Sequence, residues 1–296
     1  MQNNADYSAA ISDGGMEKER WQDDTILLVM TYSKLHRYIP AIRENLDLFW
    51  PGRPQTVYAS DAPLEGDDVI VQSEGTFLDV LEASIEQIRA RFAWAKHVFI
   101  LLEDICPLGP VEEDRLARAQ ALLRAKSGKH MNHRWATKCG LHLKYLCVDN
   151  PIKMVAEDVV VMSIPHWQHY HNQIPASFWE LDHLQDIVAQ KRELGYLDPW
   201  SFELPAHPVK EDHFVFDGIW PTVPDGFLTK GGINGTALYG KNYPPSPLKT
   251  QLRREFCGYD NVIMSFLKYK KSKWQNKHKD PKTTTVEHRR PSQHNA

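Results

Sequence analysis

The sequence predicts an α/β protein with a mostly parallel sheet flanked by helices. Over residues 25–125, short apolar runs alternate with segments of helical spacing, which is typical of repeated strand–helix–strand units. The first run, TILLVMT at residues 25–31, is a continuous apolar stretch, as expected of a strand that is covered on both faces. Two of the runs end abruptly in acidic residues, so the sequence also indicates where these strands stop.

Each element is expected from its own pattern. Strands are predicted at 25–31, 55–59, 68–72 and 97–102, and helices at 34–48, 76–92 and 111–125. Segment 76–92 has the clearest amphipathic pattern, with Phe77, Leu81 and Ile88 on one face. The repeated order implies right-handed crossovers between neighbouring parallel strands.

The second half of the sequence is less regular. The segment SFWELDHLQDIVAQKRELG at 177–195 predicts one helix, with Phe178 and Leu184 in its apolar stripe. Strand-like pieces follow at 213–216 and 237–239. We expect a disordered leader at 1–22, one domain at 23–267 with halves at about 23–125 and 126–267, and a basic flexible tail at 268–296.

Composition narrows the function classes. A net charge of -3 gives no electrostatic case for nucleic acid as a partner. The four cysteines form no zinc-type spacing. No apolar run approaches the roughly 20 residues of a membrane helix, and the N-terminal residues lack the plan of a signal peptide. We therefore expect a cytoplasmic protein, with peripheral contact to the inner membrane open only through the basic segment at 269–279.

Three strand ends are predicted to meet. In parallel sheets, ligands bind beyond the carboxyl ends of the strands. That rule brings together the residues that follow the first, second and fourth strands: Thr31, Tyr32, Ser33, Ser60, Asp61, Glu103 and Asp104.

The order TILLVMTYS, then YASD, then an apolar strand running into LED is similar to bacterial GT-A glycosyltransferases, which have a Rossmann-like fold. In that family a hydrophobic strand delivers an acidic DXD-type motif to the nucleotide diphosphate. The segment SFWELDHLQDIVAQKRELGYLDPWSFE also resembles sugar-transferase-like proteins of bacterial surface-polysaccharide clusters. The resemblance covers about residues 25–240.

The resemblance implies an enzyme that moves a sugar from a nucleotide-sugar donor to a glycan or lipid-linked acceptor in surface polysaccharide biosynthesis. The first half would bind the nucleotide and the second half the acceptor. Asp104 would hold a divalent cation, Mn²⁺ or Mg²⁺. This sequence has Glu-Asp-Ile-Cys at 103–106 where the family has Asp-x-Asp, so the second metal carboxylate is missing.

Several side chains are candidates for donor binding. They are Thr31, Tyr32, Ser33, Asp61, Glu103 and Asp104. Tyr32 would stack on the base, and Asp61 would accept hydrogen bonds from the base or ribose. Lys34 or Arg37 would face phosphate. The structural alternatives are a turn formed by Asp61 before Pro63 and a helix-capping role for the acids at 103 and 104.

Asp198 and Glu203, in the DPWSFE segment, are the candidates for a catalytic base. Transfer with inversion needs one carboxylate within hydrogen-bond reach of the acceptor hydroxyl. The alternative is a structural turn in which Asp198 caps a short helix.

Histidines and glycines suggest further sites. His130 with His133, and His166 with His169 and His171, allow a zinc site of the hydrolytic kind, although stacking or surface histidines are the simpler interpretation. Glycines at 231, 232 and 235 indicate a hairpin or, alternatively, a lid loop.

Three alternative functions stay open from the sequence alone. A nucleotidyltransferase would carry a glycine-rich loop after the first strand, and TYSKLHRYIP has no glycine there. A catalytically idle binding protein would explain the incomplete acidic motif. A metallohydrolase would use the histidines.

Overall fold

The computed structural model describes residues 20–257 apart from 126, 133–152, 157–158, 165–170, 175, 205–212, 218–227, 230–231 and 234–242. The chain divides into a unit at 1–253 and a unit at 254–296, and the fold described below belongs to the first, apart from residues 254–257. The expected leader and basic tail lie outside the described residues, except for residues 20–22.

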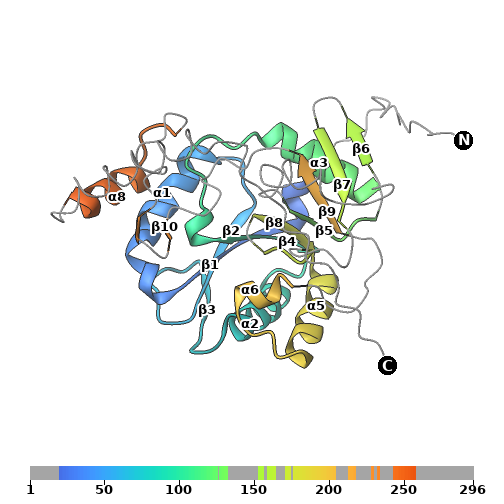
Figure 1. The fold of residues 1–296 in the computed structure, drawn as a ribbon, viewed down its shortest axis with the longest axis horizontal. Helices are drawn as coiled ribbons and strands as arrows, with labels where there is room; N and C mark the ends of the chain where they lie inside the picture. Colours follow the sequence, from blue (N-terminus) through green and yellow to red (C-terminus); the bar gives the residue numbers. More distant parts are fainter. Residues whose placement is uncertain are drawn as a thin grey trace, which may run out of the picture. The chain divides into compact units, whose positions relative to one another are not determined.

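The centre of the fold is a nine-stranded sheet in the order β3-β2-β1-β4-β8-β5-β9-β7-β6 (Figure 1). Its strands are β1 (Thr25–Thr31), β2 (Gln55–Ser60), β3 (Val69–Gln72), β4 (His97–Leu102), β5 (His130–Asn132), β6 (Lys153–Ala156), β7 (Val159–Ser163), β8 (Ser177–Glu180) and β9 (His213–Asp217). Strands β3, β2, β1 and β4 are parallel. These observations confirm the predicted α/β fold, and the predicted parallel arrangement holds for these four strands.

The other half of the sheet is mixed. Strand β8 runs antiparallel to both β4 and β5, β9 is parallel to β5, and β7 is antiparallel to β9 and β6. A separate two-stranded hairpin joins β10 (Leu228–Thr229) to β11 (Gly232–Ile233). The strand predicted at 213–216 is therefore present as β9, whereas the one at 237–239 lies outside the described residues.

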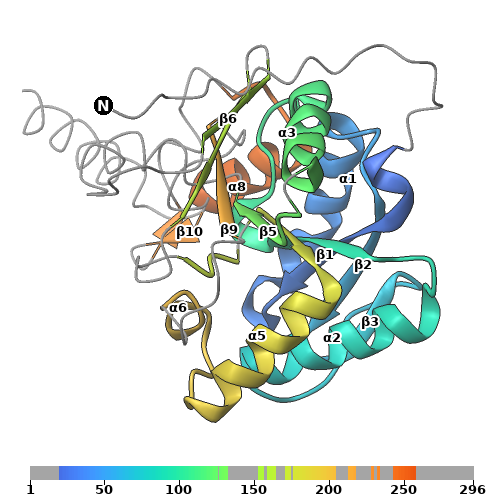
Figure 2. The ribbon, with the colours of Figure 1, turned by 90° about the vertical axis from the view of Figure 1, so that its right-hand side faces the viewer.

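Helices cover both faces of the sheet. They are α1 (Ile39–Phe49), α2 (Phe77–Arg91), α3 (Glu113–Ala125), α5 (Leu181–Glu193), α6 (Pro199–Phe202) and α8 (Pro247–Cys257), with 3₁₀ turns η1 (Trp21–Asp24), η2 (Ser33–Tyr38) and η3 (Glu103–Ile105). Helices α1 and α3 lie on one side, and α2 and α5 on the other (Figures 1 and 2). Right-handed crossovers give this two-sided cover, because the connection through α1 runs from β1 to β2, whereas the connection through α2 returns in the opposite direction from β3 past β1 to β4.

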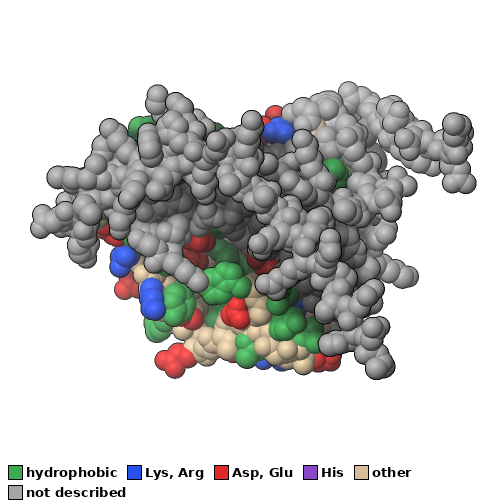
Figure 3. Space-filling model, in the orientation of Figure 1, with side chains coloured by type: hydrophobic (Ala, Val, Ile, Leu, Met, Phe, Trp, Pro, Cys, Tyr) green, Lys and Arg blue, Asp and Glu red, His purple; other side chains and the backbone are tan. Residues whose placement is uncertain are grey.

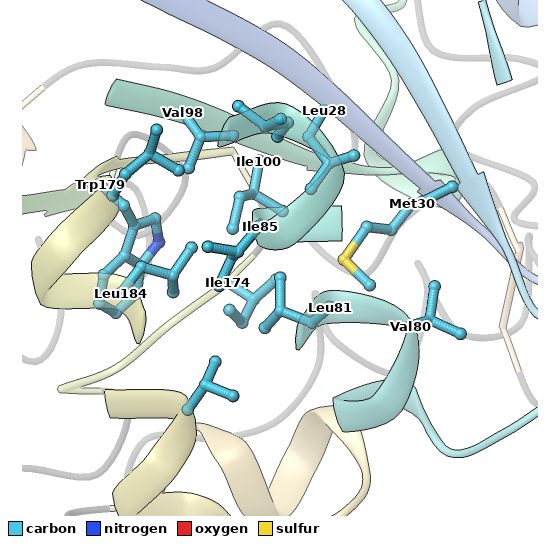
Figure 4. Close-up of a cluster of buried hydrophobic side chains, with 14 of the residues drawn as sticks. Leu28, Met30, Val80, Leu81, Ile85, Val98, Ile100, Ile174, Trp179 and Leu184 are labelled. Carbon is cyan, nitrogen blue, oxygen red and sulfur yellow. The ribbon is translucent and has the colours of Figure 1, made fainter. Parts of the chain in front are cut away.

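The apolar run of β1 serves both layers, because successive side chains point to opposite faces. Every residue of β1 is buried. Leu28 and Met30 pack with Leu81 and Ile85 of α2 and with Leu184 of α5 in one cluster (Figure 4). Each buried side chain of this size contributes about 1.5–3 kcal/mol, so burial on both faces makes β1 the anchor of the sheet.

Helix α2 begins with a capping box. The Thr76 hydroxyl accepts a hydrogen bond from the Asp79 backbone N–H at 3.3 Å, and the Thr76 N–H donates to the Asp79 carboxylate at 2.7 Å. The guanidinium of Arg192 donates to the same carboxylate at 2.9 Å. The start of α2 is thereby fixed to α5.

The predicted helix at 177–195 is wrong in its first four residues, which form β8 instead. Phe178 and Trp179 favour a strand, and β4 and β5 on either side of β8 pair with its backbone. Trp179 faces the α2–α5 cluster, whereas Phe178 stacks on His97 with ring centroids 4.8 Å apart. The helix begins only at Leu181.

The folded part also begins earlier than residue 23, where the domain was expected to start. Trp21 is buried and its ring stacks on that of Trp50, with centroids 6.3 Å apart. This aromatic contact joins η1 to the end of α1.

Candidate functional site

The strand ends that the sequence grouped are neighbours in the sheet. Thr31 at the end of β1 pairs with Ser60 at the end of β2, and Met30 pairs with Leu102 at the end of β4. The residues that follow therefore leave the sheet side by side. The strand order reverses between β1 and β4, since β2 and β3 lie on one side of β1 and β4 on the other. Open α/β sheets bind ligands at such a point.

Asp61 joins the ends of β1 and β2. Its carboxylate accepts a hydrogen bond from the Ser33 backbone N–H at 2.7 Å and a second from the Ser33 hydroxyl at 3.2 Å. Beside it, the Ser60 hydroxyl accepts from the Ala62 N–H at 3.1 Å and lies 2.7 Å from Nε2 of His36. Asp61 therefore fixes the loop after β1. The structural alternative from the sequence was different, namely that Asp61 forms a turn before Pro63.

Glu103 is a buried carboxyl group, with 8% of its surface exposed. Burial raises its pKa well above the ordinary value of 4.5, and the negative charges of Asp104 and Asp61 raise it further. Hydrogen bonds from the backbone N–H groups of Glu103 and Tyr32 act in the opposite direction. The net shift favours the protonated, uncharged form of Glu103.

Asp104 is the more accessible of the two adjacent acids. It lies in the 3₁₀ turn η3 and is half-buried, whereas Glu103 is buried. Consecutive side chains at the end of a strand point in different directions, which is the reason the sequence favoured Asp104 over Glu103 as the ligand. Asp104 is therefore accessible to solvent, and it lies close enough to Glu103 that its charge, like that of Asp61, acts on the Glu103 carboxyl group.

Tyr32 and Thr31 contribute differently to this edge. The ring of Tyr32 is 49% exposed, and Nζ of Lys34 lies 5.6 Å from its centroid. Thr31 is buried, and its hydroxyl has no hydrogen-bond partner among the described residues. Tyr32 therefore presents an open aromatic face, whereas Thr31 holds a polar group inside the fold.

Asp198 caps α6, as the structural alternative expected. Its carboxylate accepts hydrogen bonds from the N–H groups of Trp200 and Ser201 at 2.9 and 3.0 Å, and from the Ser201 hydroxyl at 2.7 Å. Partial burial opposes their effect, but together these hydrogen bonds lower the pKa of Asp198. Glu203 is half-buried and ends the same helix.

Among the described residues, α6 packs against α2 and β8 and not against the acidic strand ends. The ring of Phe202 meets Phe77 at 6.0 Å and Trp179 at 6.3 Å, edge to face. The structure thus groups the candidate donor-binding residues at one edge and places the two candidate bases at opposite ends of α6.

A cluster of three buried histidines was missed by the sequence analysis. Nε2 of His183 lies 2.6 Å from Nε2 of His213, and His213 stacks on His171 with ring centroids 4.1 Å apart. The sequence had grouped His171 with His166 and His169, which lie outside the described residues, as does His133; the side chain of His130 is not described either. The actual partners are 12 and 42 residues away from His171, so no local spacing could reveal them.

The described part of the chain holds no group of three or more His, Cys, Asp or Glu side chains arranged to bind a metal ion. At the glycine-rich segment, the described residues form the expected hairpin, because β10 and β11 pair antiparallel. Within the same described ranges, no helix has the length and apolarity to cross a membrane.

Comparison with known proteins gives no family assignment: no protein-family model and no curated protein matches the chain.

Proposed function

We propose that the chain is a glycosyltransferase with a GT-A-like fold that transfers a sugar from a nucleotide-sugar donor to a glycan or lipid-linked acceptor in surface polysaccharide assembly. The observation that carries this proposal is the meeting of Asp61, Glu103 and Asp104 beside Tyr32 and Ser33, where the strand order reverses. Strand ends at that point of an α/β sheet suit a nucleotide. The class of reaction comes from the sequence resemblance.

The donor nucleoside would lie between Tyr32 and Asp61. The half-exposed ring of Tyr32 offers a stacking surface for the base. Asp61 uses its carboxylate for two hydrogen bonds from Ser33, and a carboxylate has about four acceptor positions. It retains capacity to accept hydrogen bonds from ribose hydroxyls or a base N–H.

A divalent cation, Mn²⁺ or Mg²⁺, would be held by Asp104. Carboxylate oxygens suit these ions, which also take phosphate oxygens and water as ligands. Asp104 is half-exposed, whereas the shift in the Glu103 pKa makes that neighbour a poor anionic ligand. When bound, the cation supplies positive charge that stabilises the departing nucleoside diphosphate.

The acceptor hydroxyl would lose its proton to Glu203. Asp198 is committed to capping α6, and its lowered pKa makes it a weak base. Glu203 is therefore the better of the two candidates. A transient contact of the basic 269–279 segment with the inner membrane would suit a lipid-linked acceptor.

One observation favours a second candidate, a catalytically idle nucleotide-binding protein. Glu103 is buried with a raised pKa, which leaves Asp104 as the more accessible of the two adjacent carboxylates for a cation. An idle protein would bind the nucleotide without metal and would not break the bond between sugar and diphosphate.

Thermal melting with UDP, GDP and CMP, each with and without Mn²⁺, tests the proposal. A ligand at a hundred times its dissociation constant adds about 2.7 kcal/mol of stability, which gives a measurable rise in melting temperature. We expect one nucleotide to raise it in a metal-dependent way. A rise without metal dependence and without donor hydrolysis supports the idle protein, and no rise with any nucleotide overturns both.

A further inference from the structure

Trp200 is the most exposed large apolar side chain among the described residues. Its exposed fraction is 73%, and Leu197 and Leu194 close by in the chain are exposed by 39% and 38%. In the region of α6, hydrophobic side chains reach the surface with acidic side chains beside them (Figure 3). An exposed indole offers a large, rigid apolar face with a polar N–H at its edge, which a ligand can contact.

The backbone that carries Trp200 is held firmly. The capping box of Asp198 and Ser201 fixes the start of α6, and Phe202 is buried between Phe77 and Trp179. After the helix, the Leu204 carbonyl accepts hydrogen bonds from the buried Lys191 ammonium and, at 3.2 Å, from the Asn172 side chain. The indole is therefore presented by a preorganised support, which lowers the entropy cost of binding.

This support lies toward the same edge of the sheet as the acidic strand ends. Gln72 at the end of β3 pairs with Ser60, the neighbour of Asp61. Helix α2 starts five residues after Gln72, and the N–H of Leu78 in its first turn donates to the Leu197 carbonyl at 3.3 Å. The turn before Trp200 therefore contacts the beginning of α2, near the edge of the sheet where the donor would bind.

The chemistry around Trp200 favours a sugar over other occupants. Asp198 and Glu203 flank it in the chain, and the guanidinium of Arg192 on the preceding helix is already paired with Asp79 and Glu82. Acidic neighbours repel an anionic lipid surface. Three apolar side chains are also too few for the roughly 800 Å² that each partner of a stable protein complex contributes.

We propose that Trp200 is the stacking platform for a sugar ring of the acceptor glycan. The apolar C–H face of a pyranose lies on the indole, and its hydroxyl groups remain in reach of water and of acidic side chains. This inference rests on the proposed function, because it gives the glycosyltransferase an acceptor subsite beside its candidate base Glu203.

The test uses ¹⁹F spectra of the full chain labelled with 5-fluorotryptophan and titrated with cellotriose, chitotriose and maltotriose. Trp200→Phe and Trp94→Phe assign the two relevant signals, and Trp94, which is 44% exposed in the turn that follows α2, is the matched control. We expect at least one trisaccharide to shift the Trp200 signal saturably and leave the Trp94 signal unchanged. Trp200→Ala should weaken that binding at least tenfold.

The proposed role of Trp200 in sugar binding is wrong if none of the three sugars shifts the Trp200 signal, or if the Trp200 and Trp94 signals shift equally. Broadening of the Trp200 signal by anionic phospholipid vesicles, or by raising the protein concentration, in place of a sugar response also overturns it. The proposed function fails separately, through the absence of any nucleotide-dependent melting shift. Trp200→Ala should retain the nucleotide-dependent shift of the wild type.

Discussion

The buried carboxyl group of Glu103 is the most unusual group at the candidate site. Its pKa is raised mainly by burial and then by the charges of Asp104 and Asp61, so the folded chain holds the proton more tightly than the unfolded chain. The contribution of Glu103 to stability is therefore full below its ordinary pKa of 4.5 and is lost as the pH rises toward the folded value.

Glu103→Gln removes this ionisation and retains the size of the side chain. We expect the variant to be more stable than the wild type at pH 7. The difference should be about 1.4 kcal/mol for each tenfold by which folding lowers the acid dissociation constant of Glu103. The difference should vanish near pH 4. Urea unfolding at the two pH values measures it, and a variant less stable than the wild type at pH 7 would show that the carboxylate is ionised and held by donors.

Asp61 has a structural and a proposed binding role, which a substitution can separate. Asp61→Ala removes both hydrogen bonds from Ser33 and should cost about 1–2 kcal/mol of stability. It should also abolish the nucleotide-dependent rise in melting temperature. Asp67→Ala, at an exposed acid nearby, is the control and should change neither; an unaltered nucleotide response in Asp61→Ala would remove Asp61 from the donor site.

Helix α6 offers a test of whether Asp198 caps or catalyses. Asparagine is as good an N-cap as aspartate, whereas alanine costs about 0.5–2 kcal/mol. We expect Asp198→Asn to retain both stability and sugar transfer, and Asp198→Ala to lose stability. Donor consumption and urea unfolding measure the two effects, and a hundredfold loss of activity in a stable Asp198→Asn variant would identify a catalytic carboxylate.

Helix α5 is attached to the segment after α6 through Lys191, a buried ammonium. Burial lowers its pKa from 10.5 to about 8, so between these pH values the unfolded chain binds a proton that the folded chain lacks. Stability should therefore rise with pH over that window, by about 1–3 kcal/mol. Lys191→Met should flatten this rise in pH-dependent chemical unfolding, and an equally steep rise in the variant would assign the effect to other groups.

Periodicity in the sequence was enough to predict the strands and helices in the first half of the fold, except that the first part of the helix expected at 34–48 forms the 3₁₀ turn η2 and α1 begins only at Ile39. Runs such as Thr25–Thr31 and His97–Leu102 are buried on both faces, and their strong patterns matched the strands that formed. The same strand-end rule grouped Asp61 with Glu103 and Asp104.

Contacts between distant parts of the chain could not be predicted in this way. Strand β8 is only four residues long and leads directly into α5, so its apolar residues fit a helical stripe equally well. What makes it a strand is its place between β4 and β5, which no local pattern records. The stacking of His171 on His213 is hidden for the same reason.

At the scale of the whole molecule, we propose that a nucleoside diphosphate and a cation bind at the ends of β1, β2 and β4. Titration calorimetry of the nucleotide selected by melting, with and without Mn²⁺, measures this most directly in the wild type, Asp104→Ala and Asp114→Ala. Asp114 is an exposed acid at the start of α3 and serves as the control. We expect metal-dependent binding that Asp104→Ala weakens at least tenfold and Asp114→Ala leaves intact, and equal affinities in all three proteins would rule out Asp104 as the cation ligand.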